Sequence, residues 1–180
     1  MLTRRAMVWA AGAAAVSLIG LRPRAPRAAA ATVRTAVDFA VPPGACDCHV
    51  HVFDPAHFPY APERVYTPPA ASISDLRDLQ AALHLDRVVI IQPSVYGTDN
   101  ACTLDAVRQL GARARGVAVI DTSTPADALD AMAAAGVRGV RLNFETAGET
   151  NPDAIRHGLA SVASRCAVAT GMCSSTPACR

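Results

Sequence analysis

The stretch Cys46-Asp47-Cys48-His49-Val50-His51-Val52-Phe53-Asp54 is the segment in which local structure and chemistry point to one function. It is predicted to form a buried strand, in which alternate residues share a face. His49 and His51 therefore lie on one face, and the cysteine and valine side chains occupy the other. Two imidazoles at this spacing can bind one divalent metal ion or act together on one substrate. Two ordinary structural histidines are the alternative for an H-x-H pair.

Four strand-and-helix units follow one another from this stretch onward. Each strand is predicted from an apolar or alternating run, and each helix from helical spacing or a capping signal. The predicted strands are 46–54, 86–92, 116–121 and 137–144, and the predicted helices are 74–84, 100–110, 124–135 and 151–165. This alternation is typical of a parallel sheet covered by helices.

Two parallel architectures fit this alternation, a (β/α)8 barrel and a doubly wound open sheet. No glycine-rich phosphate loop follows the first strand, which weakens the dinucleotide-binding version of the open sheet. Histidines at the carboxyl end of the first strand favour the barrel, because barrel active sites lie at that face. We therefore predict an α/β fold that corresponds to the N-terminal half of a (β/α)8 TIM barrel, over residues 45–165.

Residues 1–31 have the features of a twin-arginine export signal. Arg4 and Arg5 precede an apolar run of about a dozen residues, too short to span a membrane, and small residues at 28–31 offer a cleavage site. An uncleaved N-terminal membrane anchor is the less favoured alternative. We expect cleavage near Ala31, a linker over 32–44, and a periplasmic or secreted protein without stable membrane insertion.

The charge outside this leader gives no indication of a nucleic-acid partner. The leader holds five arginines and no acidic residue, which leaves 12 arginines against 15 acidic residues and a net charge of −3. A strongly basic surface for nucleic acid or anionic membranes is therefore not indicated.

Four motifs in a fixed order resemble the amidohydrolase-related (amidohydrolase 2) family, and within it the 2-pyrone-4,6-dicarboxylate hydrolase and lactonase branch. The motifs occupy residues 46–55, 58–68, 114–119 and 135–144. The resemblance implies a TIM-barrel hydrolase that acts on a small carboxylated lactone by attack of water on the ring ester. It also implies that His49 and His51 either bind one divalent metal ion, zinc or manganese, or polarise the substrate without a metal.

The same resemblance implies that Tyr66 and Arg141 bind a substrate carboxylate. The residues themselves also favour Arg141, because residues 137, 139, 141 and 143 are predicted to share one strand face, and a guanidinium can bind a carboxylate through two parallel bonds. A buried salt bridge to a neighbouring acid is the alternative for Arg141. Ser94 and Tyr96, in the loop after the second strand, are candidate ligand contacts or ordinary turn residues.

Residues 166–180 are predicted to be an aberrant tail, because they show neither strand alternation nor a helical period. Permitted codons for this tail, read two bases along, encode a typical fifth strand of the family, so we expect a frameshift near Cys166. Four units would leave two strand edges unpaired. The sequence thus allows three functions: a lactone hydrolase, a truncated and inactive remnant, or a half-barrel that binds a carboxylate or a metal as a homodimer.

Overall fold

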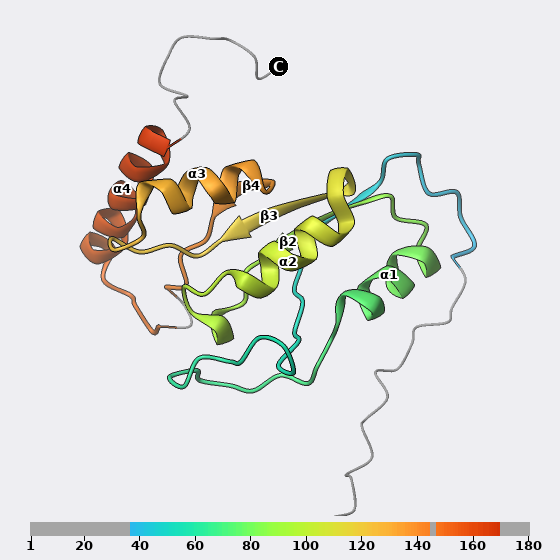
Figure 1. Cartoon of the computed structure of the whole chain (residues 1–180), viewed down its shortest axis with the longest axis horizontal. Helices are drawn as coiled ribbons and strands as arrows, with labels where there is room; N and C mark the ends of the chain where they lie inside the picture. Colours follow the sequence, from blue (N-terminus) through green and yellow to red (C-terminus); the bar gives the residue numbers. More distant parts are fainter. Residues whose placement is uncertain (1–36, 145–146, 170–180) are drawn as a thin grey trace, which may run out of the picture.

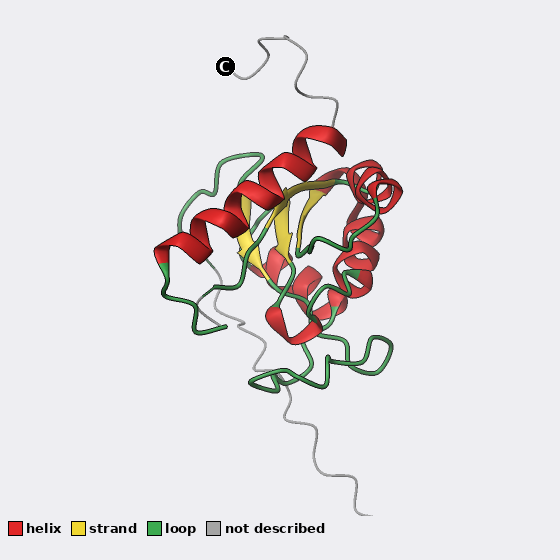
Figure 2. Cartoon of the chain, turned by 90° about the vertical axis from the view of Figure 1, so that its left-hand side faces the viewer, coloured by secondary structure: helices red, strands yellow, loops and turns green. Residues whose placement is uncertain are grey.

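The computed structural model describes residues 37–144 and 147–169. In that part the chain forms a four-stranded parallel sheet with the order β1-β2-β3-β4, so strands that are neighbours in sequence are neighbours in the sheet. Figure 1 shows the strands and helices alternating along the chain, and Figure 2 shows the helices packed beside the sheet. The predicted leader, 1–31, lies outside the described residues, as do residues 170–180 of the predicted tail.

The order of elements confirms the four predicted strand-and-helix units. The elements are β1 (Cys46–Val50), α1 (Ile73–Ala82), β2 (Arg87–Ile91), the 3-10 helix η1 (Ser94–Tyr96), α2 (Ala101–Leu110), the 3-10 helix η2 (Gly111–Arg113), β3 (Ala114–Ala118), α3 (Ala126–Ala134), β4 (Val137–Val140) and α4 (Pro152–Ala169). This α/β arrangement with a parallel sheet is consistent with part of a (β/α)8 barrel.

The core lies between the sheet and its helices. β2 is one of the two inner strands, and its Val88 and Ile90 are 1% and 0% exposed. They pack in one cluster with Val107 and Leu110 of α2. A second cluster joins β3 and β4 to α3 and α4. Each fully buried side chain of this size contributes about 1.5–3 kcal/mol to stability, so these clusters hold the helices against the sheet.

The helix ends follow local capping chemistry. At the start of α1 the Ser72 hydroxyl accepts the Asp75 N–H at 3.3 Å, and the Asp75 carboxylate accepts the Ser72 N–H at 2.7 Å. The predicted cap at Ser74 is therefore wrong, because Ser72 has the reciprocal partner three residues later. α2 ends as predicted at Gly111, whose φ of 60° is one that glycine adopts without strain.

α4 continues to Ala169, past its predicted end at residue 165. The prediction that the chain lacks a helical period from residue 166 is therefore wrong for residues 166–169. Within the described ranges, no helix has both the length and the apolar character needed to cross a membrane.

β1 differs from its prediction in length, burial and register. It ends at Val50 rather than at residue 54, and Cys48 and His49 on it are exposed. Asp47 pairs with Val88 and Val50 pairs with Ile90, so β1 has one residue more than β2 between these pairs. Such a β-bulge bends a strand and re-aims its side chains. The prediction of a regular, buried strand over 46–54 is thus wrong.

β4 also contains a register shift. Val137 pairs with Gly116 and Gly139 pairs with Val117, which leaves Arg138 as the extra residue. Val137 packs in the cluster with α3 and α4, whereas Gly139 lies against the Val117 side chain. The predicted common face of residues 137, 139, 141 and 143 is therefore wrong at residue 137, because the bulge interrupts the alternation.

Candidate active site

Five of the predicted site residues come from segments at the carboxyl ends of the parallel strands or from the loop that packs there. His49 and His51 lie at the end of β1, Ser94 follows β2, and Arg141 follows β4. Tyr66 comes from the loop between β1 and α1 and contacts Ser94. We call these five residues the carboxyl-edge site. Ligands of parallel α/β proteins bind at this edge because the strand ends and their loops converge there.

His51 is held in one orientation by the neighbouring strand. Its Nδ1 lies 2.8 Å from the Ile91 carbonyl oxygen. A carbonyl only accepts hydrogen bonds, so Nδ1 carries the proton, and Nε2 keeps its lone pair. Burial lowers the pKa of the His51 imidazole, the charges of Arg141 and His49 lower it further, and the bond to Ile91 opposes them. His51 is therefore neutral at neutral pH, with Nε2 available as a base or ligand atom.

His49 is placed by the bulge of β1. The backbone N–H of His49 donates to Asp47 Oδ1 at 3.0 Å, so a side chain takes the place of a ladder bond in the bulge. The His49 and His51 rings lie edge to face with centroids 5.2 Å apart, and Phe53 lies 5.9 Å beyond His51. The prediction that the two imidazoles lie side by side is confirmed. Asp47 is a positioning residue that alternation alone did not single out.

Arg141 is held at the carboxyl end of β2, by the carbonyl that follows the one bound to His51. Its backbone N–H donates to the Ala118 carbonyl at 2.8 Å, and its Nη1 donates to the Gln92 carbonyl at 3.4 Å. The two ion pairs within the described residues involve neither Arg141 nor its neighbours, so the alternative of a buried salt bridge is not observed there. The remaining guanidinium donors of Arg141 can therefore serve a ligand.

Two polar residues beside Arg141 contribute to this edge and were not predicted. Gln92 is 0% exposed; its Nε2 donates to the Asp99 carbonyl at 2.7 Å, and its Oε1 accepts from the Thr103 hydroxyl at 2.6 Å. These bonds fix the turn that carries Ser94. The buried Oδ1 of Asn143 has no hydrogen-bond partner in the described part of the chain. The sequence signal that could have identified Gln92 was its position as a polar residue directly after the apolar run of β2.

Tyr66 and Ser94 are brought together by a loop that folds back over the end of β2. The Ser94 hydroxyl lies 3.5 Å from the Tyr66 hydroxyl, and Tyr66 is 44% exposed. The loop is held there by the bond from the Ala61 N–H to the Val95 carbonyl, at 2.8 Å. Two hydroxyls thus face solvent close to the anchoring points of His51 and Arg141.

Tyr96 occupies a different position from the other predicted contacts. Its side chain is 3% exposed, and its hydroxyl accepts the Asp54 N–H at 2.8 Å. Burial, followed by the contact with the Cys102 thiol, raises the pKa of the Tyr96 phenol. A neutral, buried phenol that binds the backbone after β1 positions the strand end. We therefore assign Tyr96 a positioning role in place of the predicted ligand contact.

The histidine pair supplies only part of a metal site. A catalytic zinc ion takes three protein ligands. In the described part of the chain, no three His, Cys, Asp or Glu side chains are grouped so that they could hold a metal ion. Zinc or manganese at His49 and His51 would thus need at least one ligand from elsewhere. The described residues alone do not fit a complete metal centre, and the chemistry derived below uses the imidazoles themselves.

Comparison with known proteins places the site within a region that matches a protein family. A family model described as Amidohydrolase matches residues 46–167, which include the whole carboxyl-edge site. A 2-pyrone-4,6-dicarboxylate hydrolase of Comamonas testosteroni is 46% identical over 107 residues, 59% of this chain and 35% of that protein. A 4-sulfomuconolactone hydrolase of Rhizobium radiobacter is 41% identical over 109 residues, 60% of this chain and 36% of that protein. The chain spans about a third of the length of these relatives.

A solved structure shows the same partial coverage. The crystal structure of a probable 2-pyrone-4,6-dicarboxylic acid hydrolase from Acinetobacter baumannii, with citric acid bound, matches with a TM-score of 0.56 and 29% identity. The match covers 68% of this chain and 46% of that protein. The likeness therefore extends to the arrangement of strands and helices that carries the site.

Proposed function

Because the chain belongs to the amidohydrolase family, we propose that it carries the histidine pair and the carboxylate-binding arginine of a hydrolase for carboxylated lactones. The names of the two relatives above denote ring esters that bear anionic groups. The observation that carries the proposal is the orientation of His51 beside Arg141, with both side chains fixed by consecutive carbonyls of one strand end.

His51 is suited to accept a proton during hydrolysis. Its Nδ1–H is bound to Ile91, so Nε2 accepts a proton from water while the water oxygen attacks the lactone carbonyl carbon. The ring C–O bond then breaks, and the proton passes to the leaving ring oxygen. Because the pKa of His51 is lowered, the imidazole stays in its basic form at neutral pH. A general base of this kind increases the reaction rate by about 10²–10⁴-fold.

Arg141 is suited to hold an anionic substituent of the lactone. A guanidinium binds a carboxylate through two parallel, charge-assisted bonds, which orients the ring as well as attracting it. The hydroxyls of Tyr66 and Ser94 add neutral donors on the neighbouring loop. This pairing of a fixed cation with a neutral base at one edge supports the proposed substrate class.

Export through the twin-arginine route is part of the same proposal. It is supported by the residues of the leader, Arg4, Arg5 and the small residues at 28–31. N-terminal sequencing of protein from the periplasm tests it, with a mature terminus near Ala31 as the expected result. Protein that keeps Met1, or that stays in the cytoplasm, would contradict it.

The direct test uses the full chain, 2-pyrone-4,6-dicarboxylate and the variant Arg141→Gln. Hydrolysis is followed by loss of the pyrone absorbance, and binding by calorimetry. Losing charge-assisted hydrogen bonds of about 1.5–3 kcal/mol should weaken binding by about 10- to 150-fold. Arg156→Gln, on the exposed face of α4, is the matched control and should leave binding unchanged.

The possible outcomes of this test distinguish the three functions predicted from the sequence. Turnover that is lost in His51→Gln supports the lactone hydrolase. Binding without turnover, in a dimer, supports the carboxylate-binding half-barrel. No binding by a folded chain supports the inactive remnant and contradicts the proposal. Metal analysis of the active protein decides between the metal-dependent and metal-independent versions.

A further inference from the structure

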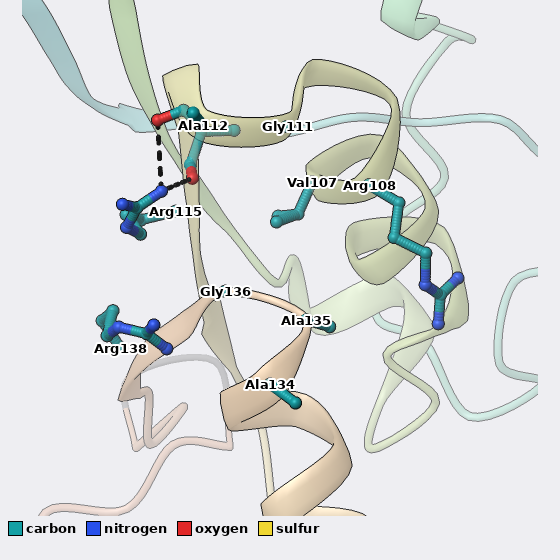
Figure 3. A pocket seen from close by; sticks show the side chains of 10 residues that line it. Val107, Arg108, Gly111, Ala112, Arg115, Ala134, Ala135, Gly136 and Arg138 are labelled. Atoms are coloured by element: carbon teal, nitrogen blue, oxygen red, sulfur yellow. Dashed lines mark hydrogen bonds between the residues drawn. The ribbon is translucent and has the colours of Figure 1, made fainter.

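A pocket of about 240 Å³ lies at the edge of the sheet opposite the carboxyl-edge site. Small residues form its floor, where α2 and α3 end and β3 begins; among them are Gly111, Ala114 and Gly136. Figure 3 shows Arg115 and Arg138 on one side of this pocket and Arg108 on the other. None of these residues belongs to the carboxyl-edge site.

The pocket has a concentrated positive charge. Three arginines line it, and no acidic residue does. The ion pairs in the described part of the chain lie in the loop after β1 and in the first turn of α4, so no described carboxylate forms an ion pair with these guanidinium groups. Arginines grouped around a concave floor of small residues attract an anion into the pocket.

Two of the three guanidinium groups are held in place by backbone carbonyls. Nη1 of Arg115 donates to Ala112 and Ala114 at 3.2 and 2.6 Å, and Nη1 of Arg138 donates to Ala133 at 2.6 Å. These carbonyls lie near the C-terminal ends of α2 and α3, where a cation is favoured. The contacts use one nitrogen of each arginine. Within the described residues, the Nε and Nη2 atoms of both have no hydrogen-bond partner and remain available for an oxyanion.

Stabilisation of the helix ends accounts for part of the arrangement, because Arg108 lies in the last turn of α2, where a cation is favoured. Its guanidinium nevertheless forms no hydrogen bond or ion pair with any described residue, and it lines the pocket. Arg138 is the extra residue of the β4 bulge, and the bulge takes it out of the regular alternation. A bulge that re-aims a charged side chain is typical of functional edges of sheets.

The geometry points to a binding site for a small phosphorylated ligand at this edge. A phosphate group presents three acceptor oxygens in different directions, so arginines on opposite sides of a pocket can share it. A planar carboxylate presents its two oxygens in one plane and suits a single guanidinium, as at Arg141. The site is separate from the proposed hydrolytic site and does not depend on it.

Calorimetric titration of the full chain with inorganic pyrophosphate, at fixed ionic strength, tests this site. We expect saturable binding at one site per chain. Arg108→Gln should weaken it about tenfold or more, because charge-assisted bonds to the anion are lost while no contact within the described fold is removed. Arg113→Gln is the matched control, since Arg113 is a neighbouring exposed arginine that does not line the pocket; its effect should stay within about twofold.

Three results would overturn the assignment. One is the absence of saturable binding by wild-type protein that is folded, as a cooperative thermal unfolding transition shows. Another is an equal loss in Arg108→Gln and Arg113→Gln, which would mean diffuse attraction by surface charge. The third is loss of pyrophosphate binding in Arg141→Gln but not in Arg108→Gln, which would place the anion at the carboxyl-edge site. Retained pyrophosphate binding in Arg141→Gln, with loss in Arg108→Gln, supports the second site whatever the outcome of the lactone assay.

Discussion

The inner strand β2 and the outer strands β1 and β4 differ in pairing and burial within the same sheet. β2 pairs with β3 in unbroken register, and its Val88 and Ile90 are almost completely buried. β1 and β4 each contain a register shift, and both have exposed residues. β2 contributes Val88 and Ile90 to the core, whereas β1 and β4 lead into the imidazoles and the guanidinium group of the carboxyl-edge site.

The difference shows where chemistry is placed in this fold. An apolar strand covered on its faces gains most from unbroken pairing and close packing. A bulge breaks the pairing locally and turns polar side chains to new directions. The last carbonyl of β2 and the one after it then serve as fixed acceptors, Ile91 for His51 and Gln92 for Arg141. The regular strand thus orients the functional groups of its irregular neighbours.

Shortening a buried side chain of β2 should have the largest effect on stability. Ile90→Ala removes a side chain that is 0% exposed. It should lower the free energy of unfolding by about 2–5 kcal/mol, through lost burial and the cavity left behind. Urea denaturation of the two proteins measures the difference. Val65→Ala, at an exposed position in the loop after β1, is the control and should change stability little; similar losses for both variants would contradict the distinction between core and edge.

Removing the acceptor inside the β1 bulge should have a smaller effect. Asp47→Ala leaves the His49 N–H without its side-chain partner, and the loss should be about 0.5–1.5 kcal/mol of unfolding free energy. Asp47→Asn keeps an acceptor oxygen and should restore most of it. NMR shifts of the His49 ring report on the local geometry. If the two variants behave alike, the bulge is not held by this bond.

The pH dependence of stability should show the smallest effect, and its sign follows from the lowered pKa of His51. Unfolded His51 takes up a proton near its ordinary value of 6.5, whereas folded His51 does so only at lower pH. The free energy of unfolding therefore keeps its full His51 contribution above about pH 6.5 and loses it as the pH falls towards the pKa of folded His51. Thermal unfolding between pH 7.5 and 5 measures it. His51→Gln should remove this part of the slope, and an unchanged slope would contradict the assignment.

Much of the fold could be predicted from local patterns. The apolar run of β2, the glycine after α2 and the order of four strand-and-helix units each depend on neighbouring residues. The bulges could not be predicted, because they arise from pairing with another strand. The N-cap of α1 was missed by two residues, since both Ser72 and Ser74 can cap and only Ser72 has a reciprocal acid.

The site was predictable in its residues more than in its contacts. His49 and His51 followed from strand spacing, and their rings do lie together. The pairing of Tyr66 with Ser94 depends on how a proline-rich loop folds back, which has no periodic signal. Tyr96 looked like a loop residue in sequence, but its side chain points into the core, as the buried ring and the bond to Asp54 show.

The most direct test of the central claim is the protonation of His51 in the folded chain. Histidine labelled with ¹⁵N reports by NMR which ring nitrogen carries the proton, and His51→Gln assigns the signal. At pH 7 we expect a protonated Nδ1, held by the Ile91 carbonyl, and an unprotonated Nε2. A proton on Nε2, or a charged imidazolium at pH 7, would contradict the proposed base and with it the account of this edge of the sheet.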